Sequence, residues 1–401
     1  MPPPKSEHTG SDQAAGGVQH VISMTIRRRD GRQVEIAGVS SGETITDIVC
    51  DAVDTDGLGL DAVVLGRVVG HDPKRRNLRV EIGASQPAFL AQGTDRAPDA
   101  EKGNGIAADT GLFQIKGLPR DGKGFTVARD IGLTGRFVVL TPFDSAIRGG
   151  RNWPDPRRQT VAALVREGGG PGGQSLGWIL RTAAVTADDA AIADEVRRLS
   201  SVWQDCKNSS RSADTLPKVL APATRPAERL LLDHPGCSKV LCPTGDAALF
   251  LAGQLRPRLP DVNVVADNRA SDLVEAAAML LGPEIALPSG GRIIMEQTQA
   301  CVTVDVDQGS CPTPAQVNRE AVDAVARHLR LRNLAGTIVI DFLTDRSRKP
   351  LTGIRSRLES ALAGDPRRIH ALDGPSPLGL IQFARERRGM PLSAILSPDD
   401  I

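Results

Sequence analysis

The residues most able to do chemistry in this sequence are three aspartates in two predicted strands. Residues 301–309, CVTVDVDQG, alternate valine with threonine or aspartate, so Asp305 and Asp307 share the strand face opposite the valines. Residues 336–342, GTIVIDF, carry Asp341 inside a nearly continuous apolar run, where an isolated ionised carboxylate is costly to desolvate. Like charges about 7 Å apart on one strand face repel each other. These carboxylates therefore predict partners of opposite charge.

The segment between the two strands predicts a helix that would bring the strands together. Thr313 fits an N-cap, Pro314 fits the first helical position, and Gln316 completes a capping-box pattern. A strand–helix–strand unit of this length allows its two strands to become neighbours in one sheet. We therefore expect the three aspartates to converge at one sheet surface.

Two kinds of partner would relieve the repulsion among these carboxylates. Hard divalent cations such as Mg²⁺ take oxygen ligands, commonly one or two carboxylates completed by water and substrate phosphate, and a bound ion would support phosphoryl transfer. Alternatively, Asp305 or Asp341 pairs with an arginine such as Arg330 or Arg332. The pattern alone leaves both alternatives open.

The bulk composition is that of an ordinary globular protein. Of 401 residues, 24% are charged and 40% apolar, and the net charge is +1, so any basic surface must be local. Aromatic residues make up only 3% and tyrosine is absent, so base stacking would rest on few rings. The six cysteines form no C-x-x-C pair, and no signal-peptide pattern or apolar run of about 18 residues occurs, which predicts a reduced, cytoplasmic protein without a membrane span.

The chain predicts several structural parts in succession. Residues 1–19 are rich in Pro, Gly, Ser and Gln, which indicates a disordered tail. A hairpin is expected around Asp30 and Gly31, and the short strands that begin near residue 60 suggest a small barrel. Residues 187–210 have the apolar spacing of a helix, and from about residue 230 strands alternate with helices. The predicted fold class is therefore mixed α+β and α/β, in several subdomains.

Five runs of sequence carry a likeness to a known family. KGFTVARDIGLTGRFVVLTP and GWILRTAA are followed by LPSGGRIIMEQTQACVTVDVDQG, LRLRNLAGTIVIDFL and GPSPLGLIQFARER. In this order they resemble the ribonuclease E/G family of bacterial single-strand endoribonucleases, and the likeness extends over residues 20–390.

The resemblance implies a particular architecture. It implies an OB-fold barrel inserted in an RNase H-like part, followed by a 5′-monophosphate sensor and a deoxyribonuclease-I-like catalytic part. The expected divisions are a tail at 1–19, RNase H-like segments at 20–60 and 216–279, the RNA-binding barrel at 61–118, the sensor at 119–215 and the catalytic part at 280–395.

The resemblance also implies an activity and the residues that carry it. The expected reaction is Mg²⁺-dependent cleavage of single-stranded RNA, in RNA processing or decay, which leaves 5′-phosphate and 3′-hydroxyl ends. Asp305 and Asp341 match the family's catalytic, metal-binding aspartates. Asp307 stands where the family has asparagine, and we expect it to be a third metal ligand that raises the negative charge of the site.

Two RNA contacts follow from the same likeness. Arg181 and Thr182 match the 5′ sensor, where an arginine fork and a hydroxyl suit a phosphate, and the loop at Lys123 and Gly124 matches the backbone that faces this phosphate. Without the resemblance, Arg181 would be expected only to end a strand at a solvated surface. In the barrel, Phe89 matches one stacking aromatic residue of the family, and Arg79 stands where the family has a second. We expect both side chains to contact RNA, together with Lys74 in a barrel loop.

Departures from the family pattern support a second hypothesis. Gln299 replaces a usual glutamate, and Asp307 and Arg79 also differ, so the chain could be an RNA-binding homologue with weak or no cleavage. The sequence ends at Ile401, where the family adds a zinc-binding C-x-x-C pair. If a homo-oligomer forms, we therefore expect its subunits to contact each other through protein surfaces and not through a shared zinc ion.

Overall fold

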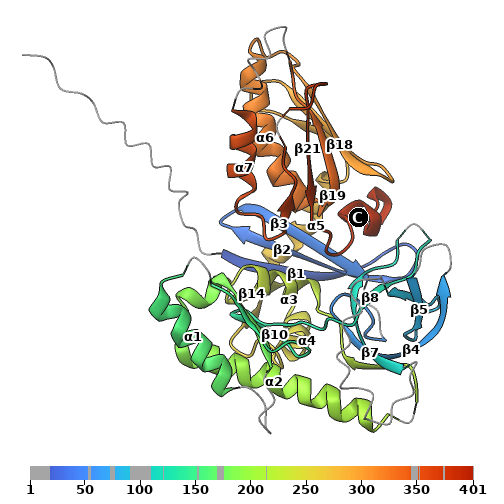
Figure 1. Ribbon diagram of the computed structural model, residues 1–401. Coiled ribbons are helices and arrows are strands. Elements are labelled where there is room, and N and C mark those ends of the chain that lie inside the picture. The colour runs from blue at the N-terminus through green and yellow to red at the C-terminus, as the bar shows by residue number, and fades with distance from the viewer. Residues whose placement is uncertain are drawn as a thin grey trace, which may run out of the picture.

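Four β-sheets with helices packed between them make up the described part of the chain (Figure 1). The computed structural model describes residues 19–52, 56–72, 77–90, 110–120, 122–150, 153–168, 176–213, 215–344, 351, 353–373 and 375–400. The predicted tail lies outside these residues, except that Gln19 already begins a strand, and Lys74 lies outside them as well. No helix among the described residues is long and apolar enough to cross a membrane.

The first sheet combines segments that are far apart in the sequence. Its strands, in spatial order, are β15 (Asn263–Ala266), β14 (Lys239–Cys242), β1 (Gln19–Arg27), β2 (Gln33–Ser41) and β3 (Thr44–Ala52). The predicted hairpin between β1 and β2 is confirmed, and Gly31 supplies its positive φ of 84°. β1 and β14 pair in parallel, although the strands of the barrel lie between them in the sequence.

Both faces of this first sheet are buried. Val39 and Val49 pack with the leucines of α3 (Pro226–Asp233) and α4 (Gly245–Leu255) on one face. Ile36 and Ile48 pack on the other face with η3 (Asn268–Ser271), α5 (Asp272–Met279), α8 (Leu392–Ile395) and Leu331. β2 is consequently buried over nearly its whole length, as expected for a central strand covered on both sides.

The predicted barrel is confirmed as a closed five-stranded, OB-like sheet. Its strands are β4 (Val63–Asp72), β5 (Asn77–Glu81), β6 (Ala88–Leu90), β8 (Thr126–Ala128) and β7 (Thr110–Gly117), which pairs back to β4; β13 (Lys218–Ala221) adds to the outer edge of β4. Closure leaves no unpaired edge within the barrel, and Phe113 and Ile115 fill its interior.

A third sheet carries the long helices at the lower left of Figure 1. Its strands are β11 (Ile147–Gly149), β12 (Gly177–Leu180), β10 (Val138–Thr141) and β9 (Leu133–Thr134), and it packs against α1 (Asp155–Glu167), η2 (Thr182–Val185) and α2 (Asp189–Arg211). α2 is the predicted helix, and its apolar stripe of Ile192, Val196, Leu199 and Trp203 is buried as expected.

The fourth sheet holds the predicted carboxylates. Its strands are β16 (Glu284–Ala286), β17 (Arg292–Gln297), β18 (Cys301–Asp307), β19 (Gly336–Asp341), β21 (Leu380–Arg385) and β20 (Ile369–His370). α6 (Pro314–Leu331) and α7 (Ile354–Leu362) cover one face, and η5 (Pro398–Asp400) lies near the end of the chain (Figure 1). The predicted strand–helix–strand unit is confirmed, because β18 and β19 are parallel neighbours joined by α6.

The start of α6 differs in one detail from the prediction. Thr313 is the N-cap and Pro314 the first helical residue, but the Thr313 side chain makes no capping hydrogen bond. Gln316 instead donates from its side-chain amide to Glu320 Oε1 at 3.1 Å. The capping-box prediction is therefore wrong, although the helix begins where it was expected.

A buried ion pair fixes the end of β21 to the turn after α7. Arg385 Nε lies 2.7 Å from Asp365 Oδ2, and the two side chains are 2% and 1% exposed. Arg385 also donates to the carbonyl oxygen of Leu334 at 2.8 Å. The pair thereby links β21, α7 and the turn that leads into β19.

Asp365→Ala should strongly destabilise this part of the protein, because it leaves the Arg385 charge buried without a partner. We expect a loss of about 3–5 kcal/mol in the free energy of unfolding, measured by urea denaturation. Glu359→Ala is the matched control, since it breaks an exposed pair with Arg355 on α7 and should change stability by no more than about 0.5 kcal/mol. Equal effects of the two variants would contradict the structural role of Asp365.

Candidate functional site

Asp305 and Asp341 stand next to each other on the fourth sheet. They are register partners on the parallel strands β18 and β19, so their Cα atoms are separated by one inter-strand spacing of about 4.8 Å. Both side chains are exposed, whereas their neighbours Val304 and Ile340 are buried beneath the sheet. The two carboxylates therefore share the open face of the sheet, opposite α6 and α7.

The ion-pair alternative for these two aspartates is not what the structure shows. Arg330 instead binds Asp47 of β3, with Nε 2.8 Å from Oδ1. Arg332 is only 6% exposed, forms the C-cap of α6, and accepts a hydrogen bond at its backbone carbonyl from the N–H of Leu392. Within the described ranges, neither Asp305 nor Asp341 has an ion-pair partner. Two adjacent exposed carboxylates that pair with no described arginine or lysine are a donor set suited to a hard metal ion.

Asp307 lies on the same face but has partners of its own. Its Oδ2 accepts hydrogen bonds from Arg292 Nε at 2.9 Å and Nη2 at 2.7 Å, and its Oδ1 accepts one from the backbone of Gly309 at 3.0 Å. The Gly309 N–H and the Arg292 guanidinium hold the pKa of Asp307 below its usual range. Arg292 also reaches Glu284 at 3.3 Å. Arg292 on the neighbouring strand β17 thus offsets the repulsion that the Asp307 carboxylate would add to Asp305 and Asp341.

No group of three or more histidine, cysteine, aspartate or glutamate side chains is gathered to hold a metal anywhere in the described ranges. A cation at this face would therefore have Asp305 and Asp341 as its protein ligands, with water and substrate oxygens completing its shell. The metal-ligand role of Asp307 stays a prediction.

Two of the three predicted RNA contacts of the barrel are brought together, and the third, Lys74, lies outside the described residues. Phe89 on β6 and Arg79 on β5 are cross-strand partners, so they share one face of the barrel. Phe89 is half-buried and Arg79 is exposed. A ring and a guanidinium plane side by side form a surface on which bases can stack.

Lys123 and Gly124 lie close to this pair. Lys123 is exposed in a tight turn, where its N–H bonds to the Arg120 carbonyl at 2.9 Å, and Gly124 is buried against Phe89. A pocket of about 270 Å³ opens here, lined by Ala84, Ser85, Gln86, Pro119, Arg120, Gly122, Lys123, Gly124 and Phe125. Gly124 is required by close approach, because a Cβ there would lie 2.5 Å from the carbonyl oxygen of Pro87.

Arg181 is held by the structure rather than solvated at a strand end. It follows β12, its backbone N–H donates to Phe137 O at 3.0 Å, and its Nη1 donates to the carbonyl of Gly135. Its Nη2 lies 3.8 Å from Asp233 Oδ1. The Arg181 side chain is 23% exposed, and Thr182 beside it is exposed. Burial lowers the pKa of Arg181, while the Asp233 carboxylate opposes that effect. An anchored cation next to an exposed hydroxyl is suited to a phosphate.

Glu195 supports this arrangement from α2 and was not anticipated. Its carboxylate accepts hydrogen bonds from the backbone N–H groups of Arg136, Phe137 and Val138 at 2.7, 2.7 and 3.0 Å. The turn between β9 and β10, which presents the Gly135 carbonyl to Arg181, is thereby fixed. The sequence signal was present, since Glu195 falls within the apolar stripe of α2, where a charged residue needs a buried partner.

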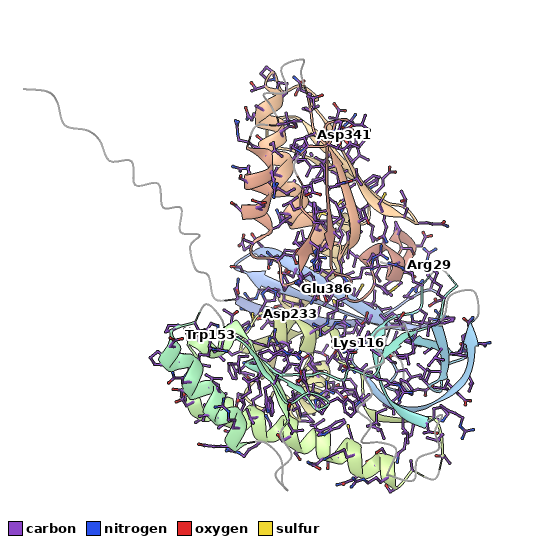
Figure 2. All side chains as sticks on the ribbon, in the orientation of Figure 1. Arg29, Lys116, Trp153, Asp233, Asp341 and Glu386 are labelled. Atoms are coloured by element: carbon purple, nitrogen blue, oxygen red, sulfur yellow. The ribbon has the colours of Figure 1, made fainter. Side chains whose placement is uncertain are left out.

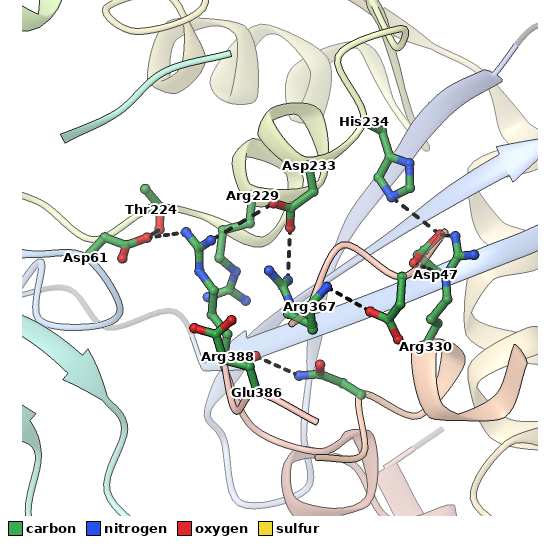
Figure 3. Close-up of polar contacts among 12 residues, drawn as sticks. Asp47, Asp61, Thr224, Arg229, Asp233, His234, Arg330, Arg367, Glu386 and Arg388 are labelled. Carbon is green, nitrogen blue, oxygen red and sulfur yellow. Dashed lines mark hydrogen bonds and ion pairs between the residues drawn. The ribbon is translucent and has the colours of Figure 1, made fainter. Parts of the chain in front are cut away.

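A buried network of charges lies between the segments that adjoin the fourth sheet and the rest of the molecule (Figure 3). Its members come from almost every part of the described chain: Asp47, Asp51, Asp61, Arg181, Arg229, Asp233, His234, Arg330, Arg367 and Arg388. Sequence analysis identified only Arg181 and Arg330 among them, because ion pairs between distant segments leave no periodic signal.

The two predicted centres of chemistry lie far apart. Figure 2 shows Asp341 at the outer end of its sheet and Asp233, the neighbour of Arg181, near the middle of the molecule. The structure therefore does not bring the carboxylate pair and the phosphate-binding candidates together in one pocket. A single ligand that contacts both must be extended.

Comparison with known proteins gives a consistent result. The profile of the Ribonuclease E/G family matches residues 132–388. A ribonuclease E from a Nostoc species is 28% identical over 388 residues, which cover 89% of this chain and 55% of that protein. A ribonuclease E from Synechocystis is 27% identical, covering 70% and 44%, and a ribonuclease G from Escherichia coli K12 is 28% identical, covering 69% and 59%. The chain thus spans about half the length of these relatives.

Gly124→Ala should destabilise the barrel, since the added methyl group would press on the Pro87 carbonyl. We expect a loss of about 1–3 kcal/mol in the free energy of unfolding. Gly70→Ala on β4 is the control, because its Cβ would meet nothing within 4 Å, and it should change stability by less than about 1 kcal/mol. Chemical denaturation of both variants checks this, and an unaffected Gly124→Ala would contradict the close packing described here.

Proposed function

We propose, on the premise that this chain belongs to the ribonuclease E/G family, that it is a Mg²⁺-dependent endoribonuclease acting on single-stranded RNA. The observation that carries the proposal is the alignment of Asp305 with Asp341 on neighbouring strands inside the matched region. The relatives named ribonuclease E and ribonuclease G support the substrate class. The products would be a 5′-phosphate and a 3′-hydroxyl end, in RNA processing or decay.

Asp305 and Asp341 would hold the metal ion. When bound, Mg²⁺ supplies Lewis acidity and lowers the pKa of a bound water. The two carboxylates face solvent on one side of the sheet, so an RNA backbone can approach them without passing through the protein core. The strands fix the separation of the two carboxylates, which keeps the geometry of the site constant.

Asp307 would be the weakest of the three predicted ligands. A cation would have to compete with Arg292, which already holds one carboxylate oxygen of Asp307 at 2.7 and 2.9 Å. We propose that the Arg292 charge keeps the third carboxylate from overcrowding the site with negative charge.

The barrel and the surrounding sheets would bind the RNA strand. We propose that Phe89 and Arg79 stack bases, that Lys74 contacts phosphate, and that the barrel is an OB-fold inserted in an RNase H-like part. The finer divisions follow the expectations drawn from the sequence: a 5′ sensor at 119–215 and a deoxyribonuclease-I-like catalytic part at 280–395. The position of the barrel between β3 and β14 in the sequence supports the insertion.

Arg181 and Thr182 would bind the terminal 5′ phosphate, with the backbone at Lys123 and Gly124 facing the same group. The anchored, partly exposed Arg181 guanidinium supports this role. Because the carboxylate pair lies far from Arg181, the substrate would have to be a strand of several nucleotides in extended form.

Asp341→Asn should abolish most cleavage, because it removes a charge from the metal site. With a 5′-monophosphorylated, AU-rich oligonucleotide and Mg²⁺, we expect a fall of roughly 10²-fold or more in kcat, which corresponds to a few kcal/mol of lost metal stabilisation. Asp307→Asn should reduce kcat much less. Asp323→Asn is the control, since it breaks an exposed ion pair between α6 and Arg357 of α7 and should leave the rate unchanged.

Equal rates for the wild type and Asp341→Asn would remove the metal role of this residue. Absence of turnover by the wild type at every Mg²⁺ concentration, with RNA binding that survives EDTA, would instead support the RNA-binding homologue. The Asp307–Arg292 pair is the observation that favours that second candidate, because it occupies the carboxylate that was expected to be a third metal ligand.

Arg181→Ala should reduce the preference for 5′-monophosphorylated over 5′-hydroxyl RNA. Loss of charge-assisted hydrogen bonds worth about 1.5–3 kcal/mol predicts a drop of roughly tenfold to hundredfold in the ratio of the two kcat/KM values. Arg197→Ala, at an exposed pair on α2, is the control and should keep the wild-type ratio. An unchanged ratio in Arg181→Ala would exclude Arg181 from the sensor.

A further inference from the structure

Asp233 is a buried carboxylate at the end of α3 that is surrounded by arginines. Its side chain is 6% exposed, and Arg367 Nη2 lies 2.9 Å from its Oδ2. Arg181 approaches its Oδ1 at 3.8 Å, and Arg388 approaches the same oxygen at 4.0 Å. Arg181 precedes η2, whereas Arg367 and Arg388 belong to the region of the fourth sheet, so Asp233 is where these segments meet (Figure 3).

The charges around Asp233 do not cancel in pairs. Arg388 also binds Asp61, with Nη2 2.8 Å from Oδ2, so three guanidinium groups share two carboxylates. Arg367 is only 5% exposed and has Asp233 as its ion-pair partner within the described part of the chain. Asp233 is the stronger and Glu195 the weaker of the two carboxylates that favour the charged Arg181 guanidinium, while Arg388 opposes it. The position of the Arg181 guanidinium therefore depends on Asp233.

Two contacts fix one side of the Arg181 guanidinium. Nη1 donates to the Gly135 carbonyl, which Glu195 stabilises through its turn, and Nη2 faces Asp233. A planar group held at both terminal nitrogens has a defined orientation, and it keeps further N–H donors for a ligand on its exposed side.

We propose that Asp233 is a positioning residue, which holds Arg181 in the orientation that binds the 5′ phosphate of an RNA. This inference rests on the proposed function of Arg181. Asp233 does not touch the RNA, and its effect is exerted through the guanidinium alone. Removing its charge lets Arg181 turn away from its neighbours, and a displacement of about 1 Å is enough to weaken a preorganised contact severely.

The experiment compares 5′-monophosphorylated and 5′-hydroxyl oligonucleotides of one sequence, with kcat and KM measured separately for each. The variants are Asp233→Asn, Arg181→Ala and their combination. Glu228→Gln is the matched control, because Glu228 is also a buried carboxylate of α3, paired with Arg258 at 3.0 Å, and has no contact with Arg181. Circular dichroism and thermal unfolding establish that each variant is folded.

We expect Asp233→Asn to lower the ratio of kcat/KM on the two substrates by roughly tenfold, with most of the change in KM for the monophosphorylated RNA. Glu228→Gln should retain the wild-type ratio. The double variant should match Arg181→Ala, because a residue that acts only through Arg181 has no effect once Arg181 is gone.

A charge-balanced variant keeps the test valid if the unpaired Arg367 charge unfolds Asp233→Asn. The combination Asp233→Asn with Arg367→Gln removes both members of the buried pair, which is far less destabilising than removing one. It should lose the 5′-phosphate preference to the same extent as Asp233→Asn.

The outcomes distinguish the positioning role of Asp233 from the proposed phosphate-binding role of Arg181. A wild-type ratio in the charge-balanced variant, together with a reduced ratio in Arg181→Ala, overturns the role of Asp233 and leaves the sensor intact. A wild-type ratio in Arg181→Ala overturns both. An equal loss in Glu228→Gln shows a general effect of disturbing α3 and also overturns the inference.

Discussion

The parallel register between β18 and β19 is the constraint on which the candidate chemistry depends. It sets Asp305 directly beside Asp341, although 35 residues separate them in the chain. α6 makes this pairing possible, because a parallel connection must cross over one face of the sheet, and the helix fills that face with apolar side chains. The carboxylates are left on the opposite, open face. A shift of one residue would turn one of them into the core.

The buried charge network links the fourth sheet to the first sheet and to the barrel. Arg330 of α6 binds Asp47 of the first sheet, and Arg388 after β21 binds Asp61 at the entrance of the barrel. Buried ion pairs add little net stability compared with apolar contacts, but breaking one of them is costly, so they favour one arrangement over others. Asp233 lies at the centre of this network, where the segments with Arg181 and Arg367 meet.

Separation of the carboxylate pair from the Arg181 region is a physical argument for the proposal that the substrate is single-stranded RNA. An extended strand can contact two distant sites, whereas a compact ligand cannot. The near-neutral net charge fits this view, since attraction for the phosphate backbone would come from local groups such as Arg79 and Lys123 rather than from the whole protein.

The sequence by itself determined the local elements and the pairing of the catalytic candidates. Valine alternation in β18, the apolar run of β19 and the proline-initiated helix between them were sufficient, because hydrophobic periodicity and chain connectivity are local properties. It did not determine the partners of charged groups: Asp307 bound to Arg292, Glu195 capping a turn, and Asp233 among its arginines. Such contacts join segments that only tertiary packing brings together, and the desolvation that makes them specific exists only in the folded core.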